Sequence, residues 1–284
     1  MRNKTLIFFC YLLFFGLVIT AQTNDSTVNY LPTSVRERIA LGFVNINDPY
    51  LSPLEYSGLI LGAEYFAQKY ISAKNHSLIS EYKYNLEIAT ASNNSNSASM
   101  QMFDGALAWG LFKNIYRNDN FQFLAGGNID TKLGIKYLAR NVNNPVNIDF
   151  ATGVNLAAAL NYRLSLFNKS TLLQFKIDFP LAGVMFVPQQ GASYYEMFSL
   201  GNTSNCFHFS APYNRLGFDY SFTVDIPLSR STLLIGIENN FLKYKANGSV
   251  YSRISNAVLV GWKYDFYVFK GKKERNAKNF MFVE

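Results

Sequence analysis

Cysteine and histidine are nearly absent from this 284-residue chain, which contains two of each. Cys10 lies in an apolar run near the N-terminus, so Cys206 is the single cysteine beyond that run. One cysteine excludes an intrachain disulfide, and His76 and His208 are too few and too far apart for a four-ligand zinc site. No phosphate-binding loop or dinucleotide fingerprint occurs either. The sequence therefore predicts neither a metal nor another cofactor.

Clustered positive charge is also missing. The chain has 26 Lys and Arg residues, of which 2 lie within the first four positions, and the remaining 24 against 19 acidic residues leave a formal charge of +5. These residues are scattered apart from a short basic run at 270–275, which is typical of a solvated tail. Because nucleic-acid binding needs a basic face, no nucleic acid is expected as a partner.

A long apolar run is absent beyond the N-terminus, and the mean hydropathy is zero, which excludes a helical membrane protein. The one apolar run, Leu6 to Ile19, is shorter than the roughly 20 residues that a membrane-spanning helix needs. It follows two basic residues and ends at Ala21 before a polar stretch. This pattern predicts a signal peptide over residues 1–21 that is cleaved on export.

Aromatic residues, by contrast, are abundant at 16% of the chain. Many of them fall in segments that alternate apolar and polar residues, as strands with one apolar and one polar face do. The clearest segment runs from Phe121 to Tyr137, where the odd positions are mainly apolar and the even positions are polar apart from Leu124 and the glycines. Similar alternation covers 78–88, 149–166, 171–181, 216–226 and 249–269, and it is less regular near 36–46, 56–70, 98–113 and 231–244.

These segments favour a membrane barrel over a soluble β-sandwich. They run 11 to 20 residues, whereas strands of soluble proteins usually have five or six. Their apolar faces are continuous and aromatic near the ends, as interfacial girdles require. We therefore predict an all-β fold, a transmembrane antiparallel up-and-down β-barrel of about ten strands over residues 36–269. Twelve strands are the alternative if Cys206 to Ser210 belongs to an extra hairpin, and a soluble β-rich ligand-binding protein is the alternative fold.

The polar faces of the strands predict the contents of the lumen. A barrel of ten strands leaves an interior that side chains fill or narrowly hydrate, which argues against a general porin. Residues on these faces carry mixed charges and amides, and we predict that they form a polar network. Its members are Gln122, Asn128, Asp130, Lys132, Asn155, Arg163, Lys176, Asp178, Asp219, Lys263 and Asp265.

The connections predict the orientation of the barrel. The longest, 188–214, contains a capping box from Ser193 to Glu196 and a terminating Gly201, which predicts a helix over 194–200 at the extracellular mouth. The Asn-Gly pair at 247–248 is a hairpin signal. Residues 22–35 and 270–284 are then periplasmic segments at the two ends of the chain.

One pair of residues suggests chemistry. His208 and Ser210 would share a face of a strand, so a hydrogen bond between them is feasible, with Glu196 as an orienting carboxylate. The spacing resembles that of outer-membrane lipid A deacylases, whose barrel has fewer strands. This resemblance implies a lipid hydrolase as an alternative function.

A broader resemblance concerns the whole chain beyond the signal peptide. Tyr50 to Gly58, Asp178 to Gly183 and Ser193 to Glu196 resemble an uncharacterised outer-membrane barrel family of the Bacteroidota, as does the end of the signal peptide. The resemblance implies no catalytic residues. We expect a non-enzymatic outer-membrane barrel that is structural or passes a narrow solute. Its expected partners are outer-membrane lipid and a small solute or lipid ligand.

Overall fold

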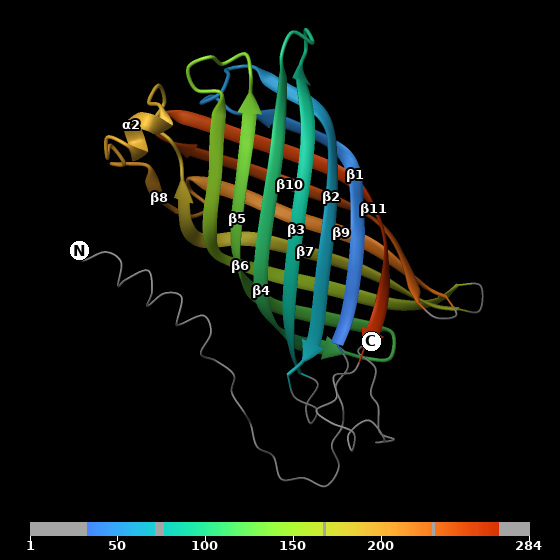
Figure 1. Ribbon diagram of the computed structural model, residues 1–284. Helices are drawn as coiled ribbons and strands as arrows, with labels where there is room; N and C mark the ends of the chain where they lie inside the picture. The colour runs from blue at the N-terminus through green and yellow to red at the C-terminus, as the bar shows by residue number, and fades with distance from the viewer. Residues whose placement is uncertain (1–32, 72–76, 167–168, 229–230, 267–284) are drawn as a thin grey trace, which may run out of the picture.

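Ten long antiparallel strands close into a barrel in the computed structural model, which describes residues 33–71, 77–166, 169–228 and 231–266 (Figure 1). A short helix and a short additional strand lie at one end. The elements are β1 (Thr33–Asn47), β2 (Glu55–Tyr70), β3 (Leu78–Asn93), β4 (Ser99–Arg117), β5 (Phe121–Leu138), β6 (Val146–Leu166), β7 (Lys169–Phe186), α2 (Tyr194–Phe198), β8 (Phe207–Ser210), β9 (Arg215–Pro227), β10 (Thr232–Ala246) and β11 (Ser249–Phe266).

Every wall strand pairs with two neighbours, and the ring closes where β1 pairs with β11 along its whole length. The strand β8 has four residues and pairs only with the end of β7. It therefore does not cross the wall as part of an extra hairpin. The prediction of ten strands is confirmed, and the alternative of twelve is wrong.

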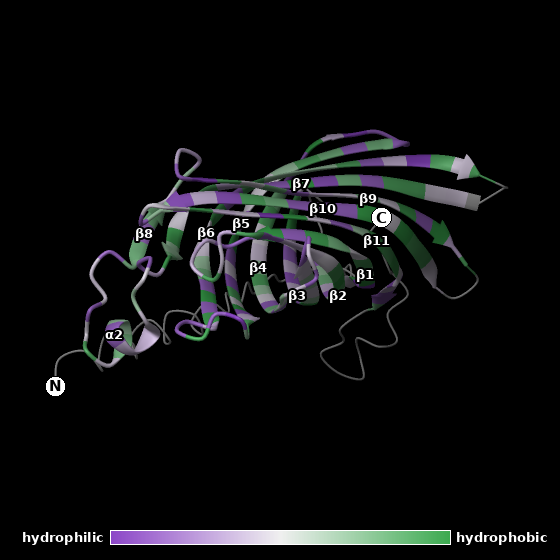
Figure 2. Cartoon of the chain, turned by 90° about the horizontal axis from the view of Figure 1, so that it is seen from above, coloured by the Kyte–Doolittle hydropathy of each residue, from purple (hydrophilic) through white to green (hydrophobic). Residues whose placement is uncertain are grey.

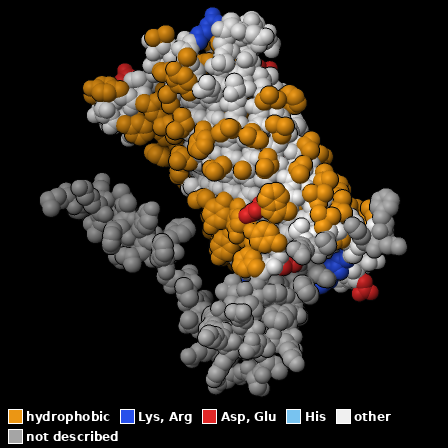
Figure 3. Space-filling view, turned by 45° about the vertical axis from the view of Figure 1, so that its right-hand side comes forward, with side chains coloured by type: hydrophobic (Ala, Val, Ile, Leu, Met, Phe, Trp, Pro, Cys, Tyr) orange, Lys and Arg blue, Asp and Glu red, His pale blue; other side chains and the backbone are white. Residues whose placement is uncertain are grey.

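The period-two pattern separates an apolar outer face from a polar interior. Along β5, the inward residues Gln122, Asn128 and Asp130 are buried, whereas the outward Ile129 and Leu133 are about half exposed. Figure 2 shows the corresponding alternation of polar and apolar bands along the strands. Figure 3 shows that apolar side chains cover most of the visible wall and that charged ones lie mainly near its ends.

The two ends of the barrel differ. At one end, called here the terminal end, Thr33 of β1 pairs with Phe266 of β11, so the start of the first described strand lies beside the end of the last. The opposite end, called here the α2 end, carries the longer connections, including α2 and β8 (Figure 1). The predicted signal peptide, His76, the basic run 270–275 and most of the two predicted periplasmic segments lie outside the described residues.

The local signals for turns and for the helix appear in the structure. Ser193 caps α2 with Glu196 in a complete capping box, and Gly201 has a φ of +74°. The helix ends at Phe198, two residues before the predicted end, and Ser199 is its C-cap. In the described part of the chain, no helix is long and apolar enough to cross a membrane.

The hairpin between β10 and β11 depends on left-handed backbone at two consecutive residues. Asn247 and Gly248 have φ values of 50° and 75°, as the tightest hairpin turns require. We predict that Gly248→Ala lowers the free energy of unfolding by about 1–2 kcal/mol, because the added Cβ makes left-handed backbone unfavourable. Urea unfolding of the lipid-reconstituted protein measures this.

The matched control for Gly248→Ala is Gly105→Ala on β4. A Cβ at Gly105 would meet its nearest neighbour at 3.4 Å, an ordinary contact, and the backbone there is not left-handed. This variant should unfold within a few tenths of a kcal/mol of the wild type. Equal unfolding free energies for the two variants would contradict the role assigned to the turn.

Candidate functional site in the lumen

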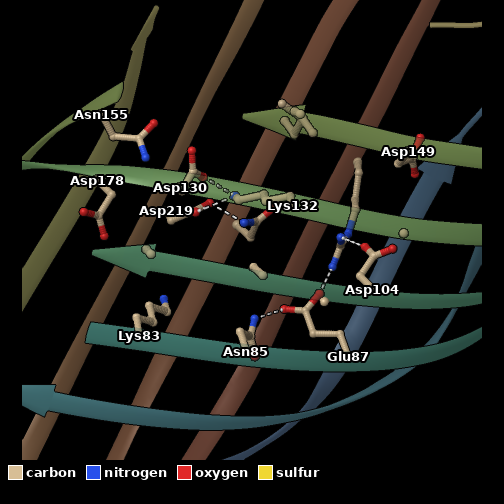
Figure 4. A pocket seen from close by; sticks show the side chains of 18 of the residues that line it. Lys83, Asn85, Glu87, Asp104, Asp130, Lys132, Asp149, Asn155, Asp178 and Asp219 are labelled. Atoms are coloured by element: carbon tan, nitrogen blue, oxygen red, sulfur yellow. Dashed lines mark hydrogen bonds and ion pairs between the residues drawn. The ribbon is translucent and has the colours of Figure 1, made fainter. Parts of the chain in front are cut away.

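The lumen holds one large cavity, called here the chamber, which is lined by residues from all ten wall strands. Its empty volume is about 1500 Å³, including the part open to solvent. Six cationic and eight anionic side chains line it, so its formal balance is −2 (Figure 4). They are Arg38, Lys83, Lys132, Lys176, Arg215 and Arg253, with Glu81, Glu87, Asp104, Asp130, Asp149, Asp178, Asp219 and Glu238.

Ion pairs lie along two opposite sides of the chamber. Glu64 of β2 accepts from Arg38 Nε of β1 at 2.9 Å and pairs with Lys83 Nζ of β3 at 2.9 Å. On the opposite wall, Lys132 Nζ lies 3.2 Å from Asp219 Oδ2, and thus joins β5 to β9. Because a buried charge without a partner is costly, these pairs allow charged side chains to occupy the interior.

Amides extend this network along one side of the chamber. Asn155 Nδ2 donates to Asn128 Oδ1 at 2.7 Å, and Asn128 Nδ2 donates to Asp178 Oδ1 at 2.7 Å. The three residues come from β6, β5 and β7. The two hydrogen bonds hold the Asp178 carboxylate beside the two amides.

A plug of side chains closes the chamber toward the terminal end. Lys176 pairs with Glu81, and its ammonium lies 4.6 Å from the ring centre of Phe66 and 5.1 Å from that of Phe112. Arg36 pairs with Asp225 at 3.5 Å beside them. An apolar cluster packs in the same region and comprises Tyr70, Ile79, Phe112, Leu124, Ala157 and Ala159.

Lys136 organises the closure at the α2 end. Its side chain is 0% exposed, and its Nζ lies 2.6 Å from Asp48 Oδ2 and 2.8 Å from Asp149 Oδ2. The same ammonium lies 4.0 Å from the ring centre of Tyr251. Since Asp48 also accepts from Asn147 Nδ2 at 2.7 Å, this cluster holds the β1–β2 loop inside the mouth.

The segment that carries α2 is fastened over the mouth by two tyrosines. Tyr194 donates to Asn147 Oδ1 at 2.8 Å and accepts from Ile148 N at 2.6 Å, whereas Tyr50 donates to the Ala192 carbonyl at 2.8 Å. Their rings meet edge to face with centres 5.8 Å apart. Burial raises the pKa of Tyr50 to about 12 and raises that of Tyr194 as well, so both phenols stay protonated and can donate.

The structure places most residues of the predicted polar network in or next to the chamber. Those that line it are Asn128, Asp130, Lys132, Asn155, Lys176, Asp178 and Asp219. Gln122 is buried nearer the terminal end and accepts from Asn161 at 2.9 Å. Arg163 and Lys263 are half-buried toward the same end, and Asp265 is exposed at its rim.

Sequence reasoning missed several charged residues of the interior. Arg38, Lys136 and Arg253 were not predicted as members of the network, nor were Asp48 and Arg215. The alternation of apolar and polar residues was the available signal for Arg38, Lys136 and Arg253, because each occupies an inward position of an alternating segment. No sequence pattern predicts that the loop residue Asp48 folds back into the mouth.

The three residues of the hydrolase hypothesis do not form a hydrogen-bonded relay in the described structure. His208 and Ser210 lie on β8, and Nε2 of His208 is buried without a partner. The Glu196 carboxylate instead accepts from the backbone N of Ser193 at 2.7 Å, which lowers the pKa of Glu196. Cys206 is buried against Met197. No cluster of metal-ligating side chains occurs among the residues described.

Removing the charge at position 136 tests the closure at the α2 end. We predict that Lys136→Met lowers the free energy of unfolding by about 3–5 kcal/mol, because it leaves the buried Asp48 carboxylate without its cation. Thermal unfolding followed by gel mobility measures this. Asp48→Asn added to Lys136→Met should recover part of the loss, and an unchanged stability of Lys136→Met would contradict the assigned role.

Comparisons with known proteins place the sequence in a family. Two similar solved structures are the outer membrane protease OmpT from Escherichia coli (8% identity, TM-score 0.45, covering 86% of this chain and 99% of that one) and the transport unit of the autotransporter AIDA-I from Escherichia coli (9%, 0.44, 92% and 97%). No curated protein matches. The model of a protein family of unknown function, DUF3316, matches residues 5–273. The chain therefore belongs to the DUF3316 family, as the resemblance to an uncharacterised family predicted.

Proposed function

We propose that this protein is an integral outer-membrane barrel whose chamber holds small polar solutes and is closed at rest. The observation that carries the proposal is the inverted distribution of side chains. Each of the ten wall strands exposes large apolar residues on its outer face, and the charged pairs lie inside. Water-soluble proteins rarely expose an apolar surface that is continuous around the molecule.

The closed hydrogen-bond ladder supports the same location. A strand in lipid cannot leave backbone groups unpaired, because the bilayer core offers no water as a partner. Pairing of β1 with β11 over fifteen residues, Thr33 to Asn47, removes both sheet edges. Such closure is what a sheet needs in order to span a bilayer.

Polar aromatic residues at the terminal end fit an interface with lipid headgroups. Trp262 Nε1 and the Tyr264 hydroxyl donate to the outward Glu37 carboxylate at 2.8 and 3.2 Å, and Trp109 Nε1 donates to Ser80 Oγ at 3.1 Å. Trp and Tyr concentrate at membrane interfaces because one part of each side chain is apolar and the other is polar. With longer loops facing outward, the α2 end is extracellular in this proposal.

Closure at both ends defines what the chamber does. The plug around Lys176 blocks the periplasmic side, and Lys136 together with the tyrosine-fastened α2 segment restricts the extracellular side. A solute that enters the mixed-charge chamber is therefore held before it can cross. Passage would require one of the two closures to rearrange.

The lipid-facing role of the outer surface is tested by a charge placed on β5. Leu133 is 56% exposed on the wall, and Leu133→Arg should cost about 2–4 kcal/mol in a bilayer. Val142→Arg, at an 88% exposed loop position, is the matched control and should be neutral. Folding efficiency into lipid vesicles, read from the heat-modifiable band, measures both. Equal, full folding of the two variants would sink the membrane proposal.

The closed chamber is tested by electrical recording. Wild-type protein in a planar bilayer should give no steady conductance, because side chains fill both ends of the lumen. The heat-modifiable band of the same sample shows that the protein is folded. A continuously open channel of uniform size would refute the closed chamber and leave the membrane location intact.

A further inference from the structure

The wall has one interruption, between β7 and β9. These strands pair only where Leu172 to Asp178 faces Asp225 to Asp219, and β7 resumes pairing at Gly183 with Ser210 of β8. In between, the four residues 179–182 face the eight residues 211–218. The paired register of β7 with β9 ends at Asp178 and Asp219, and we call the segments beyond it, 179–182 and 215–218, the β7–β9 seam.

The sequence of β7 explains why its pairing with β9 ends. Pro180 lies in it and has no N–H to donate, and the pairing of β7 with β6 shifts register at the same level, between Val154 and Asn155. Across the seam, β9 stays on β10, since Lys245 N donates to the Asn214 carbonyl at 2.8 Å. The strands stay close at the seam, since a Cβ added at Gly217 would lie 3.4 Å from Pro180 Cγ.

A second, small cavity lies at the seam, with an empty volume of about 320 Å³ that includes space open to solvent. Asp130, Lys132 and Asp219 line it and also line the chamber. On its other side it is lined by Phe218 and Phe241, whose rings stack with centres 5.0 Å apart on the outer face. The second cavity therefore lies between the chamber and the outer-face residues of the barrel at this level.

Arg215 differs from the other cations of the chamber. It is 5% exposed and lines both cavities, yet its guanidinium has no hydrogen-bond or ion-pair partner among the described residues. The other five cations of the chamber each pair with a carboxylate. Since an unpaired buried charge is costly, Arg215 is available to an anionic group that enters the seam.

The surroundings of Arg215 select the ligand. A guanidinium binds a carboxylate through two parallel hydrogen bonds. Asp130, Asp178 and Asp219 line the same cavity and would repel a doubly charged phosphate more strongly than a singly charged carboxylate. The outer lining of Phe218 and Phe241 is apolar, which suits a hydrocarbon chain.

The height of the seam fits such an amphiphile. From Lys169 to Asp178, β7 advances nine residues (178 − 169), or about 30 Å along the strand at ~3.3 Å per residue. A strand tilt of roughly 40° reduces this to about 23 Å of height, close to the apolar band of about 25 Å. The seam therefore begins near the extracellular border of the apolar band, where headgroups meet hydrocarbon.

We propose that the β7–β9 seam is a lateral binding site for a long-chain fatty carboxylate. The carboxylate binds Arg215, and the hydrocarbon chain leaves through the seam across Phe218 and Phe241. The site rests on the proposed function in one respect: lipid must surround the wall at this level. Heat-modifiable folding of every sample checks that condition separately from binding.

Saturable retention of radiolabelled palmitate by the full chain in lipid nanodiscs, relative to empty nanodiscs, tests the role of Arg215. Arg215→Gln should weaken binding at least tenfold, the loss expected for a charge-assisted hydrogen bond. Arg215→Lys should retain part of the affinity, and Arg140→Gln, an exposed loop control, should retain all of it. Equal binding by folded Arg215→Gln would overturn the proposal, as would tighter binding of hexadecyl phosphate than of palmitate.

A reversible crosslink tests the route of the chain. In a Cys206→Ala background, Pro180→Cys and Gly217→Cys place two thiols on opposite sides of the seam. Oxidation should abolish palmitate binding and reduction should restore it, whereas either single cysteine variant should bind in both conditions. Undiminished binding by the fully crosslinked, folded protein would overturn passage through the seam.

Discussion

The pairing of each wall strand with two neighbours is the constraint on which this structure depends. An apolar outer face removes water as a hydrogen-bond partner, so each strand needs two neighbours. The ring of ten strands meets this need by joining β1 to β11. Closure in turn fixes the alternation of side chains, because successive residues of a paired strand point to opposite faces. Apolar residues therefore face outward, and polar ones must share a confined interior.

Confinement explains the chemistry of the interior. Charged groups that cannot reach bulk water are stable there only when they are paired. Lys136 is the extreme case, since it is 0% exposed and lies between Asp48 and Asp149. Such pairs link strands that are distant in sequence and, together with packed aromatic rings, narrow the lumen toward both ends. The same interactions thus stabilise the barrel and, in the proposed function, keep its chamber closed.

Much of this architecture could be predicted from the sequence because it is local. Alternation along 121–137 depends only on neighbours in the chain, and so do the capping box at Ser193 and the left-handed pair at Asn247 and Gly248. The partners inside the lumen could not be predicted. Whether Arg253 meets Glu87 and Asp104 depends on the tilt and stagger of the closed sheet, which no single strand encodes.

Length and regularity also limited the prediction of the strands. The segment near 36–46 looked irregular because Ala40 and Gly42 occupy inward positions that polar residues fill elsewhere. Small residues are suitable there, since an added Cβ at Gly42 would lie 2.0 Å from the Asn256 carbonyl oxygen. The seam was not predicted, for a different reason. Pro180 was a signal for it, but a proline alone does not show which neighbouring strand loses a partner, and that depends on how the strands are paired around the wall.

The seam and Arg215 are exceptions to the pairing of strands in the wall and to the pairing of charges in the chamber. The paired register of β7 and β9 ends at the seam, and Arg215 is a buried cation without a carboxylate partner among the described residues. Both border a single cavity, and their coincidence is the basis of the proposed ligand site. In the proposed closed barrel, a lateral site would give access to the interior without opening either end.

Spin labels placed one at a time along β5, in a Cys206→Ala background and a lipid bilayer, test most directly whether the outer face lies in lipid. Labels at the outward positions Ile129, Leu133 and Ile135 should be accessible to oxygen and shielded from a water-soluble nickel complex. Labels at the inward Asn128 and Asp130 should be poorly accessible to oxygen, so that accessibility repeats every two residues. Outward labels that the nickel complex reaches as freely as it reaches the loop residue Val142 would contradict a membrane-embedded barrel.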